Sequence, residues 1–542
     1  MMKNINKLFK IGFLALLLLL TAHPPVTAGV LTDDELLELV ERRAFDFFWE
    51  EANPSNGLIK DRANNFTPDD YAVASIASVG FGLTAICIAD ARGWISSEEA
   101  YDRVLTTLRT FRNGGVESVE GFFYHFLDMN TGQRAWDCEL SSIDTTLFLA
   151  GALYAGRYFR GTPVETLARE IYEQVDWQWM AHNRSNYFVD MGWQNPTDGF
   201  LNIYWNSYNE GILLYFLAIG SPTHPIDSDV WKFIGRPVGS YGEYNFVYVG
   251  QNSLFAHQYP YLWLNLKNRK DGKGYDYFDN SRKATLANRQ YCIDNQASFS
   301  TYGTNSWGIT ACDGPDGYKA YTAPPTGSLI KDDGTIAPTA AGGSLIFTST
   351  ESIAVLRNFY QTYSETTNRL WGRYGFSDAF NLSVSSAGWF GQDVIGIDQG
   401  AILLAIENYR SGLVWDDFMK IDCIQTAMSK LNFTSEFDVT PSQPISGAFT
   451  VKSYPNPFYL SKNKTNTISY RVAEEGPVKL RVYSLSGQLI REWDQGRQAV
   501  GEYKFGWSGE NESNELIASG IYLLVLYRQD QIMNRTKIAV IK

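Results

Sequence analysis

The residues best suited to do chemistry lie in one acidic stretch, which runs from Trp136 to Asp144. It holds three carboxylates within eight residues, Asp137, Glu139 and Asp144, among aromatic and apolar neighbours. Burying a carboxylate is costly unless it is paired or hydrogen-bonded, so the pattern suggests a task for these groups. Hydrolysis of a glycosidic bond is one reaction that uses carboxylates as acid and base. Helix capping, or pairing with an arginine, is the competing interpretation for each residue taken alone.

Two more carboxylates stand alone at the starts of apolar helical runs. Glu210 follows an aromatic segment and precedes the run 212–219, and apolar surroundings would raise its pKa as a general acid requires. Asp398 lies between glycines in the segment 396–400 and is a candidate general base. The alternatives are an interaction of Glu210 with the helix dipole and an N-cap role for Asp398.

Polar and aromatic residues in several other segments could bind sugar hydroxyls, although packing in the core is the competing interpretation for each one. These candidate substrate-binding residues are His125, Trp205, His257, Gln258, Arg289, Asn305, Trp307, Trp371 and Arg373. No spacing links His125 and His257 as a metal pair, so we expect no metal. The reaction inferred here needs no organic cofactor.

Length and charge limit the classes of partner. A chain of 542 residues is too long for one ordinary core, so we expect two domains, one of them large. The net charge of −13 repels phosphate backbones and polyuronates, which favours a neutral substrate and no nucleic-acid partner. The five cysteines are scattered and lack metal spacing, so most are expected to be buried thiols.

The first 28 residues have the pattern of a signal peptide. Three lysines precede the apolar run 11–20, which is too short to span a bilayer, and small residues before Gly29 offer a cleavage site. No later segment predicts a membrane helix. We therefore expect an exported protein that is periplasmic, attached to the cell surface or extracellular.

Residues 29–435 show mainly helical periodicity. Capping boxes at 32–35 and 96–99 mark two helix starts. Further helical patterns cover 71–92, 139–159, 163–180, 204–219, 226–234, 251–267, 276–293, 347–364, 398–410 and 414–430. About twelve helices joined by long loops favour a mainly α fold, an (α/α)6 toroid in which six inner helices form a barrel and the loops at one rim build a cleft. A plain helix bundle, with shorter loops, is the alternative.

The chain changes character after residue 435. Residues 436–451 have the composition of a linker, and the apolar period in 452–542 is two, which predicts a small C-terminal β-sandwich. This tail resembles the immunoglobulin-like modules of the hook-capping or secretion-sorting type, through the segments 454–458, 482–487 and 519–522. The resemblance implies delivery through a secretion machinery. A plain accessory domain is the alternative.

The large domain resembles the glucoamylase-like proteins, and more specifically glycoside hydrolase family 144. The matching segments are 136–144, 208–210, 221–225, 257–260, 280–282, 287–290, 305–308, 313–318, 333–340, 370–376 and 396–400. The resemblance implies an (α/α)6 barrel that cleaves β-1,2-glucan with inversion and releases sophoro-oligosaccharides, or that removes sophorose from chain ends. It also implies that Glu210 is the acid and that the cluster 137–144 supplies essential carboxylates. Asp398 is the hypothetical base, and Cys138 stands where a small residue is expected.

Other functions stay open at this point. A polysaccharide lyase can use the same helical architecture, but it needs a cationic groove, and the chain is acidic and holds only five histidines. A non-catalytic glycan-binding surface protein would use the same cleft without turnover. A glucoamylase acting on α-linked starch is a third alternative. We expect a monomer.

Overall fold

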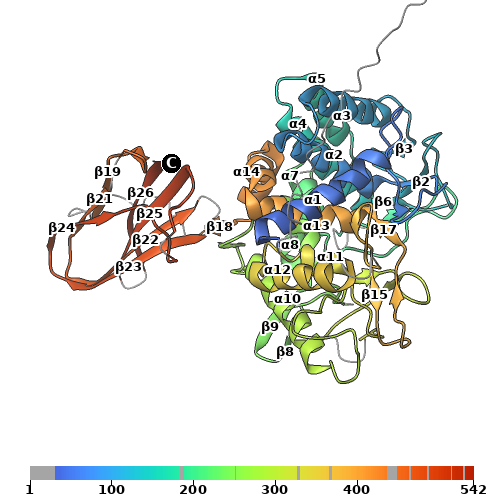
Figure 1. Ribbon diagram of the computed structural model, residues 1–542. Helices are drawn as coiled ribbons and strands as arrows, with labels where there is room; N and C mark the ends of the chain where they lie inside the picture. The colour runs from blue at the N-terminus through green and yellow to red at the C-terminus, as the bar shows by residue number, and fades with distance from the viewer. Residues whose placement is uncertain are drawn as a thin grey trace, which may run out of the picture.

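The computed structural model describes residues 31–182, 188–250, 252–325, 330–364, 369–435, 449–462, 465–484, 487–513, 515–528 and 531–542. The predicted signal peptide, 1–28, and most of the predicted linker, 436–451, lie outside these residues. Helices dominate up to residue 430, and only strands follow from Thr450 (Figure 1). The C-terminal β-rich region that the apolar period predicted is therefore confirmed.

The longer helices occur throughout the first part of the chain. They are α1 (Asp33–Glu50), α2 (Ile76–Ala91), α3 (Ser97–Arg112), α4 (Ser142–Tyr158), α5 (Pro163–Glu173), α7 (Ile212–Gly220), α9 (Phe255–Trp263), α10 (Tyr277–Asp294), α12 (Ser349–Phe359), α13 (Gly396–Arg410) and α15 (Asp422–Lys430). The shorter ones are α6 (Trp177–Met180), α8 (Val230–Phe233), α11 (Pro338–Gly342) and α14 (Leu413–Phe418), and a π-helical turn, η2 (Tyr360–Ser364), extends α12. The five-residue helix α11 was not predicted, because it is too short to show a helical period.

Six of these helices pack on one another in chain order. Helix α2 contacts α4, α4 contacts α7, α7 contacts α9, α11 contacts α13, and α13 packs back on α2. The link from α9 to α11 is a hydrogen bond from the Gln258 side chain to the carbonyl of Ala340, at 2.8 Å. Nearly every residue of α2, α4 and α7 is buried, whereas α3 and α5 bury one stripe and expose the other. A helix that is apolar on all faces is buried in the core, whereas an amphipathic helix lies at the surface. The distribution of apolar residues therefore distinguishes the inner helices from the outer ones.

Helices α2 and α4 approach closely at two glycines. A Cβ atom at Gly151 would lie 1.9 Å from the carbonyl oxygen of Gly80, and one at Gly80 would lie 2.2 Å from that of Leu147. Real atoms do not come so close, so no side chain fits between these two backbones. This contact brings the first turns of α2 and α4 together.

Short strands lead directly into three of the inner helices. They are β2 (Val73–Ser75) before α2, β6 (Leu140–Ser141) before α4 and β17 (Asp393–Ile395) before α13. They pair with β5 (Phe126–Asp128), β7 (Gly192–Trp193) and β1 (Arg62–Asn64), respectively. In Figure 1 the labelled strands β2, β6 and β17 lie together on the side of the helical domain that is turned away from the C-terminal strands. The N-terminal ends of α2, α4 and α13 therefore meet there.

The sequence placed several helix starts too early. The patterns over 71–92, 139–159 and 204–219 become helical only at Ile76, Ser142 and Ile212. In the first two, the preceding residues pair as strands, and the side chains of Ser75 and Ser141 cap the helices. The capping boxes at Thr32 and Ser96 are confirmed, with both reciprocal hydrogen bonds present.

The other short strands of the helical domain form hairpins and one closing pair. These are β3 (Ser118–Val119) with β4 (Phe122–Phe123), β8 (Val238–Tyr241) with β9 (Tyr244–Val247), β10 (Arg269–Lys270) with β18 (Thr434–Ser435), β11 (Ala311–Cys312) with β12 (Lys319–Ala320), β13 (Trp371–Gly372) with β14 (Gly375–Phe376), and β15 (Phe380–Asn381) with β16 (Trp389–Phe390). The pair β10–β18 joins the end of the helical part to the loop before α10.

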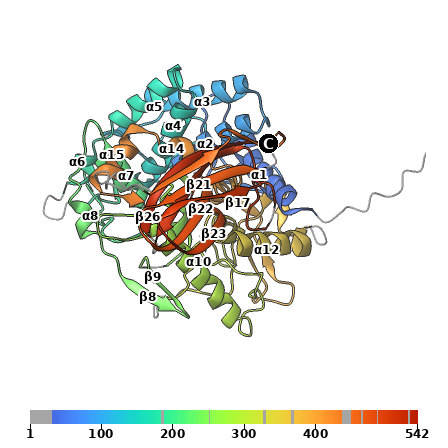
Figure 2. The same cartoon turned by 90° about the vertical axis from the view of Figure 1, so that its left-hand side faces the viewer.

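The C-terminal part consists of two sheets. One has the order β19 (Thr450–Tyr454), β21 (Asn466–Val472), β24 (Gly501–Trp507). The other has the order β20 (Phe458–Tyr459), β26 (Gln531–Ile541), β25 (Gly520–Arg528), β22 (Gly476–Ser484), β23 (Leu489–Gln498), and only the β20–β26 pair is parallel. Buried residues from both sheets, among them Ile468, Leu480 and Leu524, share one core, separate from that of the helices. Figure 2 shows this region in front of the helical domain.

All five cysteines lie among the described residues as buried, free thiols, as the sequence predicted. In the part of the chain that the structure describes, no helix has both the length and the apolar character of a membrane span.

Candidate active site

A cavity of about 560 Å³ opens where the N-terminal ends of the inner helices meet. Three carboxylates line it, from Asp61, Asp144 and Glu210. The aromatic residues that line it are Tyr71, His125, Phe126, Trp136, Phe255, Tyr259 and Tyr318. An apolar cavity with a few convergent carboxylates is the usual form of an enzyme site.

Glu210 has the properties of a general acid. It lies two residues before α7, and its side chain reaches the cavity. Burial raises the pKa of its carboxyl group to about 7, and the negative charge of Asp144 adds to this effect against a hydrogen bond from its own backbone. A carboxyl group with a pKa near neutrality keeps its proton in a substantial fraction of molecules at neutral pH and can donate it.

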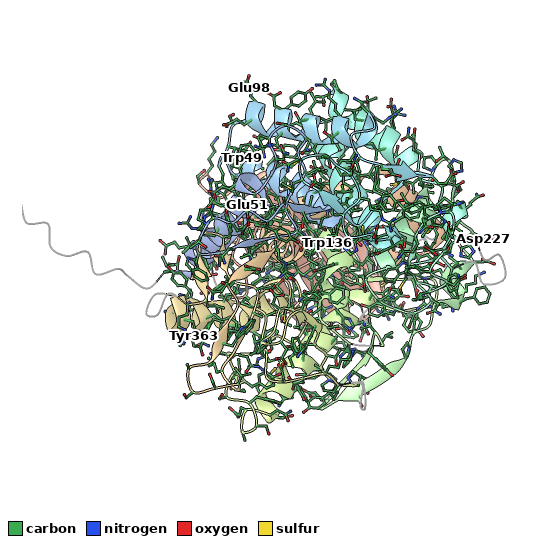
Figure 3. All side chains as sticks on the ribbon, turned by 90° about the vertical axis from the view of Figure 1, so that its right-hand side faces the viewer. Trp49, Glu51, Glu98, Trp136, Asp227 and Tyr363 are labelled. Carbon is green, nitrogen blue, oxygen red and sulfur yellow. The ribbon has the colours of Figure 1, made fainter. Side chains whose placement is uncertain are left out.

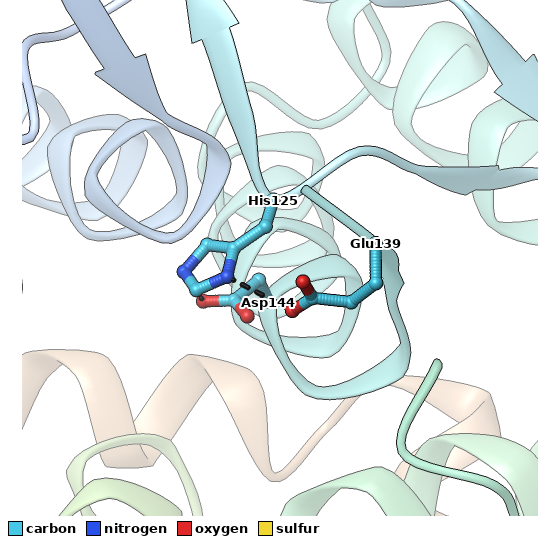
Figure 4. Close-up of side chains that lie close together, drawn as sticks. All are labelled: His125, Glu139 and Asp144. Carbon is cyan, nitrogen blue, oxygen red and sulfur yellow. Dashed lines mark hydrogen bonds and ion pairs between the residues drawn. The ribbon is translucent and has the colours of Figure 1, made fainter. Parts of the chain in front are cut away.

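The acidic stretch brings two of its three carboxylates to one histidine, His125 (Figure 4). The Nδ1 atom of His125 lies 3.1 Å from Glu139, and its Nε2 atom lies 3.4 Å from Asp144. Burial lowers the pKa of His125, but the charges of Asp144 and Glu139 outweigh it and raise the pKa to about 9. The hydrogen bond from His125 in turn lowers the pKa of Glu139. The imidazole of His125 therefore holds the two carboxyl groups at the edge of the cavity.

The start of α4 places these groups. Glu139 precedes the helix, so its orientation does not follow the helical period that the sequence suggested for it. The Ser141 hydroxyl caps the helix by accepting from the amide of Asp144, at 3.2 Å, and donates to the carboxylate of Asp144, at 2.5 Å. The N-cap thus locks the Asp144 side chain in place.

His125, Glu139 and Asp144 form the one group of three among the described residues whose donor atoms could hold a metal ion, all within 4.8 Å of one another. A carboxylate pair with one imidazole suits a divalent cation. However, the raised pKa of His125 favours a protonated ring, which already satisfies both carboxylates. The absence of a metal from the reaction stays a prediction.

Asp137, the third carboxylate of the stretch, is exposed and does not line the cavity. Its backbone carbonyl accepts a hydrogen bond from Arg134, at 2.6 Å. Its catalytic role stays a prediction.

Asp398 lies behind the cavity wall, on the first turn of α13, while its neighbours Ile395 and Ile397 line the cavity. Its side chain is 3% exposed and lies beside Asp378, which is equally buried. Burial raises the pKa of both groups, and the charge of Asp398 raises that of Asp378 further. Two adjacent buried carboxyl groups cannot both ionise, so they share one proton. A hydrogen bond from Asp378 opposes the effect of burial on Asp398, whose pKa is still raised to about 7.

Electrostatic contact links Asp398 to the cavity. Burial and then the charge of Asp398 raise the pKa of the hydroxyl groups of Tyr259 and Tyr318, which both line the cavity. Tyr259 also experiences the charge of Glu210. The two acids proposed from sequence are thus brought to the same region, one in the cavity and one behind its wall.

Besides the carboxylates at His125 and the pair Asp378–Asp398, the structure holds a third cluster of acidic residues around Asp61, which the sequence did not predict. The Arg62 guanidinium lies 3.4 Å from Asp61 and 3.0 Å from Asp313, and the carbonyl of Asp61 accepts from the amide of Gly396 at the start of α13, at 2.7 Å. Burial raises the pKa of Asp61, against the charge of Arg62. Asp61, Arg62 and Asp378 stand in no recognisable motif, and no signal in the sequence marks them.

Four of the predicted substrate-binding residues are buried in the core. His257 contacts Tyr208 at 3.2 Å and Asn252 at 3.1 Å, and burial lowers its pKa to about 3. The remaining three, Gln258, Trp307 and Trp205, are also buried, and the indole nitrogen of Trp205 donates to Ser142 at 2.9 Å. None of the four lines the cavity. They support the helices that surround it.

The other predicted binding residues lie away from the cavity lining as well, except for His125. Arg373 pairs with Glu50 at 3.1 Å, and the Trp371 ring packs against Phe376 with centroids 4.8 Å apart. Arg289 is half-buried and Asn305 is exposed. Their contact with substrate stays a prediction.

Comparison with known proteins agrees with this geometry. The family model for Glycoamylase, described as "Putative glucoamylase", matches residues 202–422, and that for the FlgD Ig-like domain matches residues 460–531. A solved structure of a protein described as a putative glucoamylase, from Bacteroides uniformis ATCC 8492, is 32% identical with a TM-score of 0.68, covering 75% of this chain and 98% of that one.

Two further relatives have names that state an activity. The endo-β-1,2-glucanase of Chitinophaga pinensis, solved with sophorotriose and glucose, is 29% identical with a TM-score of 0.68, covering 75% of this chain and 99% of that one. The exo β-1,2-glucooligosaccharide sophorohydrolase (non-reducing end) of Parabacteroides distasonis is 29% identical over 440 residues, which are 75% of this chain. The chain spans only 59% of the length of that relative.

The relatives, together with a buried glutamate and further carboxylates around one cavity of a helical domain, define a glycoside hydrolase. The chain belongs to the glucoamylase-like (Glycoamylase) family, whose relatives include β-1,2-glucanases and sophorohydrolases, and it carries an additional FlgD Ig-like domain. The resemblance drawn from the sequence is thereby confirmed.

Proposed function

We propose that this protein hydrolyses β-1,2-glucan to sophoro-oligosaccharides by an inverting, single-displacement mechanism. The observation that carries the proposal is Glu210, a cavity carboxyl group whose pKa is raised to about 7 by burial and by Asp144. The activities for which the relatives from Chitinophaga pinensis and Parabacteroides distasonis are named support the choice of linkage.

In this mechanism, Glu210 donates its proton to the glycosidic oxygen as the bond from that oxygen to the anomeric carbon breaks. A water molecule attacks the anomeric carbon from the opposite face and gives one proton to a carboxylate. The products are two shorter glucans. The one that contains the attacked anomeric carbon has a new reducing end of inverted configuration. One water molecule is consumed; the base then releases its new proton to solvent, and Glu210 takes up a proton from solvent.

We assign the base to Asp398, because it and Asp378 share one proton, which leaves one carboxylate able to accept the proton of the attacking water. Because Asp398 lies behind the wall of the cavity, it would take the proton of the attacking water through a second water rather than directly. Asp144, which lines the cavity itself, is the second candidate for the base.

The architecture forms part of the same proposal. The order in which α2, α4, α7, α9, α11 and α13 pack supports an (α/α)6 toroid with the cavity at one end of its inner ring. We further propose that the protein is exported, acts as a monomer and uses its C-terminal Ig-like domain for sorting through a secretion machinery. The signal-peptide pattern and the FlgD Ig-like match support export and sorting.

An exo-acting sophorohydrolase is the second candidate, favoured by the name of the Parabacteroides distasonis relative. Chromatography of early products from long linear β-1,2-glucan distinguishes the two, because endo cleavage releases a range of oligosaccharides and exo cleavage releases sophorose alone.

The test compares wild type with Glu210→Gln and Asp398→Asn on linear β-1,2-glucan, with product anomers read by NMR. We expect each variant to lose at least about a hundredfold in kcat, the range of general acid–base catalysis. A kcat equal to that of wild type in either variant would show that the replaced residue does not have the role proposed for it. A product whose unsaturated ring absorbs ultraviolet light would show that the enzyme is a lyase and not a hydrolase.

A further inference from the structure

Trp136 stands out among the large apolar side chains because it is 62% exposed and yet lines the cavity. Figure 3 shows it near the middle of the face of the helical domain that is turned away from the C-terminal strands. Tyr318, which is 51% exposed over the whole residue although its hydroxyl group is buried, lines the same cavity. Isolated exposed apolar residues are ordinary on protein surfaces, but two large aromatic ones at a single cavity need an explanation.

The backbone that carries Trp136 is strained. Its φ angle is +56° and that of Asp137 is +49°, a left-handed conformation that residues with a Cβ atom rarely adopt. Neither residue is a glycine, which would adopt this conformation freely. Strain of this kind persists where the surrounding structure enforces it, and it gathers at functional sites.

Arg134 is the group that enforces it. Its guanidinium donates to the carbonyl of Asp137 at 2.6 Å, to that of Cys138 at 2.5 Å and to the side chain of Gln194 at 2.9 Å. The same group lies over the ring of Tyr124, 4.6 Å from its centroid. A single arginine side chain thus holds the C-terminal end of the strained turn and links it to Gln194.

The contacts of the indole ring leave much of it accessible. The ring meets Phe126 with centroids 5.1 Å apart at 57°, and Tyr71 with centroids 6.2 Å apart at 64°. Tilted contacts of this kind orient the ring without covering it as a parallel stack would. An open aromatic face beside carboxylates suits a ligand with an apolar face and many hydroxyl groups, which describes a neutral pyranose and excludes an anionic one.

We propose that Trp136 is a stacking platform for one glucosyl unit of the substrate at the mouth of the cavity, and that Arg134 positions it through the strained turn. The inference rests on the proposed function and adds to it a residue that binds substrate without taking part in proton transfer. Tyr318 is the second aromatic contact in the same cavity.

The experiment uses the full chain with Trp136→Gly and Trp136→Phe, and Phe233→Ala as the matched control, since Phe233 is 64% exposed and does not line the cavity. Glycine removes the ring and relieves the left-handed strain, so Trp136→Gly should keep or raise the melting temperature. Its KM for long linear β-1,2-glucan should rise about tenfold, the effect of losing one aromatic contact, with kcat close to wild type. Phenylalanine should restore most of the affinity, and Phe233→Ala should behave as wild type.

Binding is measured separately, so that the platform can be tested even if hydrolysis is not seen. Affinity for sophoro-oligosaccharides is determined by calorimetry in a Glu210→Gln background, with and without Trp136→Gly. An unchanged dissociation constant overturns the platform, and so does a weaker affinity that comes with a lower melting temperature. Failure of the wild type to cleave β-1,2-glucan overturns the proposed function instead, and the binding comparison still decides the role of Trp136.

Discussion

His125 and His257 were both expected to bind substrate, and the structure gives them opposite environments. His125 lies at the cavity between two carboxylates, and their charges raise its pKa to about 9. His257 is completely buried among neutral partners, a tyrosine hydroxyl and an asparagine amide, and burial lowers its pKa to about 3. The same side chain thus favours its charged form at neutral pH in one place and its neutral form in the other, because the charge of its neighbours differs.

The largest effect is expected on catalytic activity, which a change of His125 should lower and a change of His257 should not. Replacing His125 with Gln should lower kcat/KM by about tenfold to a hundredfold, since hydrogen bonds to a charged group contribute roughly 1.5–3 kcal/mol. Glu139 and Asp144 would lose the cation that holds them, and the fold should survive. Steady-state kinetics with a circular dichroism control measures this. Activity equal to wild type would mean that the ion triad does not serve the reaction.

The matched change at the second histidine should act on stability instead. His257→Phe should lower the free energy of unfolding by about 1–3 kcal/mol, because it leaves buried groups of Tyr208 and Asn252 without their partner. The folded fraction should keep its kcat. Denaturant unfolding and kinetics on the same preparation provide the comparison, and a large loss of kcat with unchanged stability would contradict it.

The two histidines should also contribute to stability with opposite dependence on pH. The pKa of folded His125 lies above the unfolded value near 6.5, so its contribution is full below that value and is lost as pH rises through about 9. The pKa of folded His257 lies below the unfolded value, so its contribution is full above about 6.5 and is lost as pH falls toward 3. The free energies of unfolding of wild type, His125→Gln and His257→Gln are measured across pH. His125→Gln should lack the loss of stability toward pH 9, and His257→Gln should lack the loss of stability toward pH 3.

The smallest effect is expected on the pKa values of the two histidines when the residue beside each one is changed. Glu139→Gln removes one anion beside His125 and should lower the pKa of His125, whereas Asn252→Asp places one beside His257 and should raise the pKa of His257. With only five histidines in the chain, imidazole NMR titration can follow both. A pKa that moves in the other direction at either site would show that burial, and not the neighbouring charge, sets the difference.

Local features were predictable wherever they depend on neighbours in sequence. The capping boxes at Thr32 and Ser96, the C-terminal strands and the buried cysteines follow from short-range patterns, and all are confirmed. The recognition of Glu210 rested on its position before an apolar helix, and its pKa is raised as expected. Helix starts at Ile76 and Ser142 were placed too early, because strand pairing with distant segments replaces the first helical turn.

Long-range features could not be predicted in the same way. Asp61 and Asp378 belong to the acidic region only because β1, β17 and α13 bring residues far apart in the chain together. Gln258, Trp307 and Trp205 look like sugar-binding residues in sequence, yet all three are buried away from the cavity. Trp136 is exposed beside a turn that Arg134 holds by hydrogen bonds, and no periodicity reveals either feature.

The sequence alone determined most of the longer helices, the change from helices to C-terminal strands and the choice of Glu210 as the candidate proton donor, because each depends on residue type and local spacing. Tertiary structure alone decided which carboxylates share the cavity, which histidine is charged and which aromatic ring faces solvent. The physical reason is that a pKa and an exposed area depend on everything within a few ångströms, and most of those neighbours come from other parts of the chain.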